Sequence, residues 1–379
     1  MRIGDTQQPL IKALGRALAS ETAFSDPSQR VRIVYVTSGS CTNVDAVYSG
    51  TPITENLFYL PTPEEDPDFD PSAQPSPTCR NDYGPGGVPG ASIDVGISAT
   101  FVSSCQVPST LLDIRVFSGP VQAYLWVVPE PSTHKALTME EGYFAFGFGN
   151  DSALSSWNDE TAMHIRPQTK SSILTPAAAI GVPASRWRGV RWDKSTQVLS
   201  AVVADGAVLP QHSIGILGAQ IYDRNRPQIN ALAFRGKGQW YAYYPDSTPN
   251  ARDKKNVRDG HYLPWSPIEM MIPYDPATGQ PLNHDALTIV NMLIDAPVAL
   301  PLRFAPIDYV IAAGMVPRCA MQVTRRFEGG DLEPAPAEQP CSCYYEAQVG
   351  SLGADCVPCD PVTRPCTSGV CRLGYCEAR

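Results

Sequence analysis

The stretch VRIVYVTSGSCT (residues 31–42) joins a short apolar, β-branched run to a turn of small and hydroxyl-bearing residues. The run is typical of a buried strand, and Ser38-Gly39-Ser40 predicts the turn that ends it. Upstream, PLIKALGRALAS (residues 9–20) carries apolar residues at helical spacing behind a proline, which suits the first turn of a helix. A helix followed by a strand is the start of an α/β pattern.

The alternation continues along the chain. Thr138 and Glu141 have the spacing of a capping box, which predicts a helix start. Further strands are expected at residues 93–97, 122–129 and 212–217. Further helices are expected at residues 173–180, interrupted at Pro176, and at 197–205 and 283–294. Strands alternating with helices predict an α/β fold with parallel sheets. The 37 prolines among 379 residues exclude a long-helix protein.

The net charge limits the classes of binding partner that can be expected. The chain has 29 Lys and Arg against 38 Asp and Glu, a net charge of −9, and no long basic run. Nucleic acid is therefore not expected as a partner. A local set of backbone amides can still bind a small anion in an acidic protein. The longest apolar stretch, residues 296–316, carries Arg303 and Asp308, so no transmembrane segment is expected.

The cysteines are concentrated at the C-terminal end of the chain. Seven of the 11 lie in the last 39 residues, after a linker at residues 333–340. This density is typical of an oxidising compartment, so we expect a periplasmic, extracellular or cell-surface protein whose signal peptide has been removed. The alternative is a cytosolic protein with zinc-bound cysteines. No histidine follows His284, and we expect a disulfide knot and no metal or cofactor.

All 11 cysteines are candidates for disulfides. The seven in the tail together with Cys319 make eight, enough for four bridges with 105 connectivities. Three cysteines remain, an odd number. Either Cys79 or Cys41 could pair with Cys105, and the third thiol would then be free or paired elsewhere. The cysteines concerned are Cys41, Cys79, Cys105, Cys319, Cys341, Cys343, Cys356, Cys359, Cys366, Cys371 and Cys376.

Four short segments have the composition of a ligand site. Each places small or polar residues where a strand ends and a helix or turn follows. Ligand crevices in open α/β sheets lie at such strand ends, where helix N-termini, hydroxyls and an arginine can bind an oxyanion. The segments are Gly4-Asp5-Thr6, Ser38-Gly39-Ser40-Cys41-Thr42, Asp94-Val95-Gly96-Ile97-Ser98, and Arg166 with Thr169-Lys170-Ser171-Ser172.

The order of these segments resembles that of PstS-type phosphate-binding proteins of the type 2 periplasmic binding protein superfamily. Residues 213–217 (SIGIL) resemble that family's later Ala-Ile-Gly-Tyr-like strand, and residues 257–264 (VRDGHYLP) its Gly-x-Tyr-Pro stretch. The resemblance covers about residues 2–315. Cys41 and Cys105 are similarly placed to the cysteines of a Cys-bearing branch.

The resemblance implies a two-lobed α/β clamshell: residues 1–118 with 263–318 as lobe 1, 119–262 as lobe 2, and 319–379 as a Cys-rich module. It implies a non-enzymatic protein that binds a small anionic solute, phosphate first, between its lobes and presents it to a membrane transporter. The ligand-binding residues it implies are Thr6, Ser40, Asp94, Arg166, Ser171 and Ser172. Asp5 and Lys170 depart from the family pattern and are expected to modify the site.

Two other classes remain. A structural or cell-surface interaction protein would reuse the fold with a degenerate site, which the tail, Asp5 and Lys170 favour. A hydrolase would need a triad, but the five histidines are scattered and no H-E-x-x-H, G-x-S-x-G or P-loop motif occurs. His164 near Arg166 suits either the cleft or a structural role. The aromatic residues at 240–244 suit either sugar binding or core packing.

Overall fold

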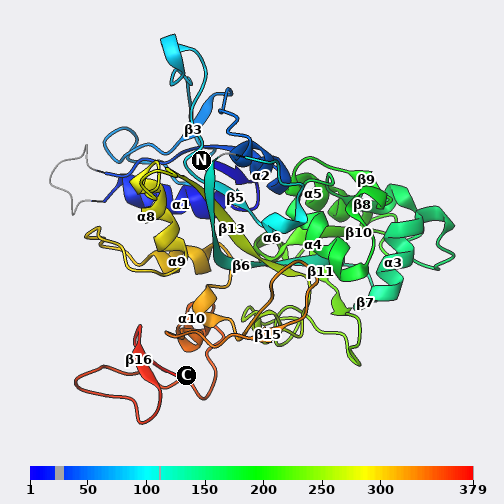
Figure 1. The fold of residues 1–379 in the computed structure, drawn as a ribbon. Helices are drawn as coiled ribbons and strands as arrows, with labels where there is room; N and C mark the ends of the chain where they lie inside the picture. The colour runs from blue at the N-terminus through cyan, green and yellow to red at the C-terminus, as the bar shows by residue number, and fades with distance from the viewer. Residues whose placement is uncertain (22–29, 111, 379) are drawn as a thin grey trace. The chain divides into compact units, whose positions relative to one another are not determined.

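A computed structural model describes residues 1–21, 30–110 and 112–378. The chain forms two compact units: unit 1 comprises residues 1–120 and 267–313, and unit 2 comprises 121–266 and 314–379. The predicted lobe boundaries lay after residues 118, 262 and 318. That residues 319–379 form a module of their own stays a prediction. No helix among the described residues is both long and apolar enough to cross a membrane. Figure 1 colours the chain from blue in unit 1 to red in the tail.

Unit 1 is built on a mixed sheet. Its strand order is β4-β3-β2-β1-β5-β13, in which β1 pairs in parallel with β2 and β5. The outer strands and β13 pair antiparallel. The elements are β1 (Arg2–Gly4), α1 (Gln8–Ala19), β2 (Val34–Ser38), α2 (Ser40–Tyr48), β3 (Leu57–Tyr59), β4 (Thr78–Cys79), η2 (Pro85–Gly87), β5 (Gly96–Ser98), η3 (Val102–Ser104), α8 (His284–Leu293) and α9 (Pro306–Ala312), with parts of β6 (Asp113–Pro129) and β13 (Trp265–Tyr274).

Helix α2 packs closely on strand β5 because the strand begins with a glycine. A Cβ added at Gly96 would lie 2.4 Å from a methyl of Val47, so no larger residue fits there without movement. Val44 and Val47 of α2 are fully or almost fully buried and form an apolar cluster with Leu57 and Met271. The Asn43 side chain donates to the carbonyl of Ile97 at 2.8 Å. These contacts fix the start of α2 beside the end of β5.

The strands of unit 2 also pair in a mixed, parallel and antiparallel, arrangement. Strand β6 lies between β11 and β10, both antiparallel to it, and β10, β8 and β9 follow in parallel. The elements are β7 (Ala136–Thr138), α3 (Met139–Phe148), η4 (Gly149–Asp151), η5 (Glu160–Ala162), β8 (Met163–Ile165), α4 (Ser171–Ile180), η6 (Ala184–Arg186), β9 (Val190–Arg191), α5 (Ser195–Asp205), β10 (Ile214–Gly218), α6 (Ala219–Asn225), β11 (Ile229–Ala231), β12 (Ala233–Arg235), α7 (Lys255–Arg258), η7 (Arg318–Ala320), β14 (Val323–Thr324), β15 (Glu333–Pro334), α10 (Ser342–Gln348), β16 (Val370–Arg372) and β17 (Tyr375–Glu377).

The expected α/β class is confirmed, and one helix corrects the prediction. Thr138 and Glu141 make both bonds of the capping box at α3, at 3.1 and 2.8 Å. Helix α4, predicted to break at Pro176, instead runs without interruption from Ser171 to Ile180. A proline removes one backbone donor, and the buried apolar side chains Ile173, Ala177 and Ile180 hold this helix against its unit.

The described residues contain five disulfides. Cys319 and the seven tail cysteines form four of them, as predicted, in the pairs Cys319–Cys341, Cys343–Cys356, Cys359–Cys371 and Cys366–Cys376. Of the two open alternatives, Cys41 pairs with Cys105. The inclusion of Cys79 among the disulfide cysteines was wrong, because all ten others are paired and Cys79 is a free thiol. Its side chain packs against the apolar cluster of unit 1 as a small hydrophobic group.

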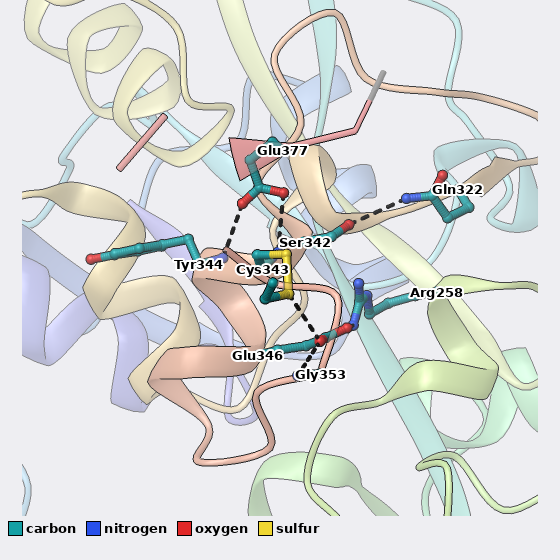
Figure 2. The surroundings of a disulfide bond; sticks show 9 residues. Arg258, Gln322, Ser342, Cys343, Tyr344, Glu346, Gly353 and Glu377 are labelled. Carbon is teal, nitrogen blue, oxygen red and sulfur yellow. Dashed lines mark hydrogen bonds and ion pairs between the residues drawn. A yellow bond between two sulfur atoms is a disulfide. The ribbon is translucent and has the colours of Figure 1, made fainter. Parts of the chain in front are cut away.

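Within unit 2, the Cys-rich tail is fastened to the rest of the unit through helix α10 (Figure 2). Arg258, which is buried, donates to the carboxylate of Glu346 on α10 at 2.7 Å and to the carbonyl of Ala320 at 3.0 Å. Its guanidinium also lies 5.3 Å from the ring centre of the buried Tyr345. At the far end of the tail, Glu377 accepts hydrogen bonds from the amides of Cys343 and Tyr344 in the first turn of α10. The two ends of the tail thereby close on one another.

We expect Arg258→Met to lower the free energy of unfolding of unit 2 by about 3 kcal/mol, because the change leaves the largely buried Glu346 without its cation. Arg326→Met is the matched control, since Arg326 is exposed and its ion pair with Glu333 should contribute at most about 1 kcal/mol. Urea unfolding followed by tryptophan fluorescence measures both. Equal losses in the two variants would show that the buried ion pair does not fasten the tail.

Candidate ligand-binding edges

Three parallel strands of unit 1 end at one edge of the sheet. Gly4 is in register with Ser38, and Arg2 with Gly96, so β1, β2 and β5 run in the same direction side by side. Their carboxyl ends lead into the turn that holds Thr6, the start of α2 at Ser40, and the segment that holds Thr100. We name this set of strand ends the unit 1 edge. Strand ends of this kind are where α/β sheets bind ligands.

The hydroxyls of the unit 1 edge are buried and locally ordered. Ser40 accepts a hydrogen bond from the amide of Ala99 at 3.2 Å, which connects the end of β2 to that of β5. Thr6 accepts from the Gln7 side chain at 2.6 Å. Thr100 lies in a tight turn, in which its carbonyl accepts from the Ser98 hydroxyl at 2.7 Å. Thr100 was not among the predicted site residues, and the hydroxyl spacing of Ser98 and Thr100 was the available signal.

Asp94 does not belong to this edge. It lies two residues before β5, where the strand begins, and the amide of Arg2 bonds the next carbonyl, that of Val95. Because β1 and β5 are parallel, Asp94 lies at the opposite end of the strands from Thr6 and Ser40. The sequence predicted a strand at residues 93–97, whereas β5 spans Gly96–Ser98, and this boundary decides on which edge the carboxylate lies.

Two other carboxylates lie at the unit 1 edge. Asp5 is half-buried in the turn after β1. Glu269 of β13 pairs in register with Ser98, is buried, and accepts from the amide of Val102 at 2.5 Å. Sequence reasoning missed Glu269, although a lone acid within the apolar run WSPIEMMIPY was a usable signal. The Cys41–Cys105 disulfide joins the start of α2 to the segment after β5.

Unit 2 holds the other predicted residues at its own strand end, after β8. Arg166 follows β8 directly and is fully buried. Its guanidinium donates to the carbonyl of Asp193 at 2.7 Å and to the hydroxyl of Ser195. Ser171 and Ser172 open helix α4 and are buried. The guanidinium that was predicted to bind an anion therefore organises its own unit.

Neither of the helices that start at the candidate segments is capped by a side chain. Gly39 is the N-cap of α2 and has no side chain, and Lys170 is the N-cap of α4 and makes no side-chain cap bond. The first amides of an uncapped helix carry partial positive charge and suit an anion. Thr6, Ser40, Ser171 and Ser172 are thus placed beside helix starts or strand ends, each within its own unit.

His164 is a structural residue. Its Nε2 lies 2.7 Å from a carboxylate oxygen of Asp205, and its Nδ1 accepts from the Trp192 indole at 3.2 Å. Both ring nitrogens are therefore used, Nε2 as donor and Nδ1 as acceptor. Of the two roles left open by the sequence, the cleft and a structural role, these contacts within unit 2 favour the structural one.

No protein-family model matches this chain, and no curated protein matches it significantly. Among solved structures, it is similar to a putative phosphate ABC transporter substrate-binding protein with bound phosphate from Clostridium perfringens, at 11% identity over 83% of this chain and 98% of the other, with a TM-score of 0.49. A phosphate-binding protein from Stenotrophomonas maltophilia matches at 10% identity over 83% and 89%, with a TM-score of 0.41. An ABC-type phosphate transport receptor from Vibrio cholerae matches at 12% identity over 59% and 79%, with a TM-score of 0.38. At these values the similarities assign neither a family nor a function.

Proposed function

We propose that this chain is an exported, non-enzymatic solute-binding protein that takes a small oxyanion, phosphate first, and delivers it to a membrane transporter. The observation that carries the proposal is the unit 1 edge. Buried hydroxyls of Thr6, Ser40 and Thr100 lie at three adjacent strand ends, and the start of α2 beside them has no capping side chain. Hydroxyl donors and uncapped amides are what a tetrahedral oxyanion needs.

The carboxylates of the edge set the protonation state of the ligand. Asp5 is adjacent to Thr6, so its carboxylate would lie within a few ångströms of an anion bound there. Two negative charges at that distance repel one another. An oxyanion that keeps a proton can donate it to a carboxylate, whereas sulfate has no proton to donate at neutral pH. We therefore expect phosphate to bind and sulfate to be rejected. In unit 2, Ser171, Ser172 and Lys170 at the start of α4 are the second proposed contact set.

Titration calorimetry tests the proposal. Phosphate should release or absorb measurable heat, and Ser40→Ala should weaken phosphate binding about tenfold to a hundredfold, the value of one hydrogen bond to a charged group. Thr42→Ala, two residues along the same helix and exposed, is the matched control and should leave the affinity unchanged. The absence of heat and of a thermal shift at millimolar phosphate would refute phosphate binding.

A second candidate function rests on Arg166. Its guanidinium is fully buried and bonded to Asp193 and Ser195 of its own unit. Because these partners use the guanidinium that would otherwise bind an anion, they support a structural or cell-surface interaction protein in which the anion site is degenerate. The same calorimetry separates the two proposals, because a degenerate site gives no heat with phosphate, sulfate or any other small oxyanion.

A further inference from the structure

Unit 2 contains a surface pocket beside the Trp192 side chain that contacts His164. It has a volume of about 370 Å³ and is lined by Trp192, Thr196, Gln197, Ser200 and Ala201. We name it the Trp192 pocket. Trp192 comes directly after β9. Thr196 and Ser200 are four residues apart on α5 and therefore lie on one face of that helix. Figure 1 shows α5 and β9 within unit 2.

The Trp192 ring is held in place by a chain of hydrogen bonds. Its backbone amide donates to the carbonyl of Ile165 at 2.9 Å, which continues the strand pairing. Its indole N–H donates to His164, and His164 is bonded in turn to Asp205 at the end of α5. Because the one polar atom of the indole is used inside the unit, Trp192 offers the pocket a carbon surface. A preorganised ring loses little conformational entropy when a ligand stacks on it.

The rest of the pocket is polar and uncharged. Thr196 and Ser200 contribute hydroxyls and are exposed. The Gln197 carbonyl oxygen accepts from the amide of Lys194 at 2.9 Å, so its NH₂ group remains as a donor. No lining residue is ionisable. A neutral molecule with both hydroxyls and a C–H face matches this lining.

We propose that the Trp192 pocket binds one pyranose unit of a neutral saccharide. One face of a pyranose ring consists of C–H groups and would stack on Trp192, while its hydroxyls would bond Thr196, Ser200 and the Gln197 amide. The volume lies near the lower bound of about 300–1,000 Å³ for small-molecule sites, which suits a single sugar ring. This proposal does not rest on the proposed oxyanion binding, since the lining residues differ from the proposed anion contacts. The pocket does lie near Arg166, whose partner Ser195 begins α5.

Saturation-transfer NMR on the full-length oxidised protein tests the proposal. The probes are glucose, galactose, mannose and N-acetylglucosamine at millimolar concentration, each with its methyl glycoside. We expect at least one sugar to bind with a millimolar Kd. Methyl-glycoside binding of equal strength would identify the ligand as a unit of a polysaccharide, and loss of binding on methylation would identify a free sugar.

Variants locate the binding. Trp192→Ala should abolish the signal, and the double change Thr196→Ala/Ser200→Ala, which alters only exposed hydroxyls, should weaken binding about tenfold. Val208→Ala is the control, because Val208 is 72% exposed and does not line the pocket. Near-ultraviolet circular dichroism checks folding, and the double variant remains decisive if Trp192→Ala unfolds. No binding by any sugar, or binding that survives both pocket variants, overturns the proposal.

Discussion

Replacement of Lys254 by methionine is expected to lower the free energy of unfolding of unit 2 by about 3–5 kcal/mol. Lys254 is almost completely buried, and its ammonium lies 2.8 Å from a carboxylate oxygen of Asp223 and 2.9 Å from one of Asp246. Arg226 also pairs with both carboxylates. The four groups form a neutral cluster of two cations and two anions. Removing one cation leaves the buried Asp246 and the largely buried Asp223 with a single cation, Arg226.

The adjacent lysine provides the control. Lys255 has a side chain that is 55% exposed and an ion pair with Asp259 one helical turn on, so Lys255→Met should change the stability by at most about 1 kcal/mol. All six tryptophans lie between residues 126 and 265, within unit 2, so urea unfolding followed by fluorescence reports on this unit alone. Similar losses in the two variants would mean that the buried cluster is no more stabilising than a surface ion pair.

The effect should depend on pH. Burial raises the pKa of Asp246 above its ordinary value of 3.8, and the charge of Asp223 raises it further, while Lys254 lowers it. Without Lys254, the folded-state pKa rises more. A carboxyl with a raised folded-state pKa binds its proton more tightly when folded, so its destabilising charge is present above that pKa and disappears as pH falls through it. The loss caused by Lys254→Met should therefore be smaller at about pH 5 than at pH 7.

Local signals predicted local structure well. The capping box at Thr138 and the helical periodicity of residues 9–20 and 283–294 each correspond to a helix of the structure, with bounds that differ by one or two residues. In these segments the deciding interactions lie within one turn of the chain, so neighbouring residues contain the information. Strand β13 was missed, because its two prolines and Glu269 interrupt an otherwise apolar run.

The candidate site could be predicted only in part, because it depends on which strand ends meet. Thr6 and Ser40 follow strands that are visible in the sequence, and the structure brings these strands together in parallel. Asp94 and Glu269 show the limit. Whether a carboxylate lies at the beginning or the end of a strand changes with a boundary shift of two or three residues, and only the register with Ser98 places Glu269 at the unit 1 edge.

The second large effect is expected in unit 1. The double change Cys41→Ala/Cys105→Ala should lower the stability of this unit by roughly 4 kcal/mol, because the disulfide spans a sequence separation of 64 residues and its loss frees that loop in the unfolded chain. Cys79→Ala is the control. Cys79 is a free, half-buried thiol that packs on the same apolar cluster as Cys105, so its loss should cost no more than about 1 kcal/mol.

Hydrogen exchange measured by mass spectrometry gives the required resolution, since unit 1 contains no tryptophan. Peptides from β2, α2 and β5 should lose protection in the double variant, while peptides from unit 2 should not change. Because Ser40 and Ala99 are bonded across the same two segments that the disulfide joins, the unit 1 edge should open first. If Cys79→Ala reduces protection as much as the double variant does, packing rather than the cross-link orders this edge, and the disulfide has no special part in shaping the proposed oxyanion site.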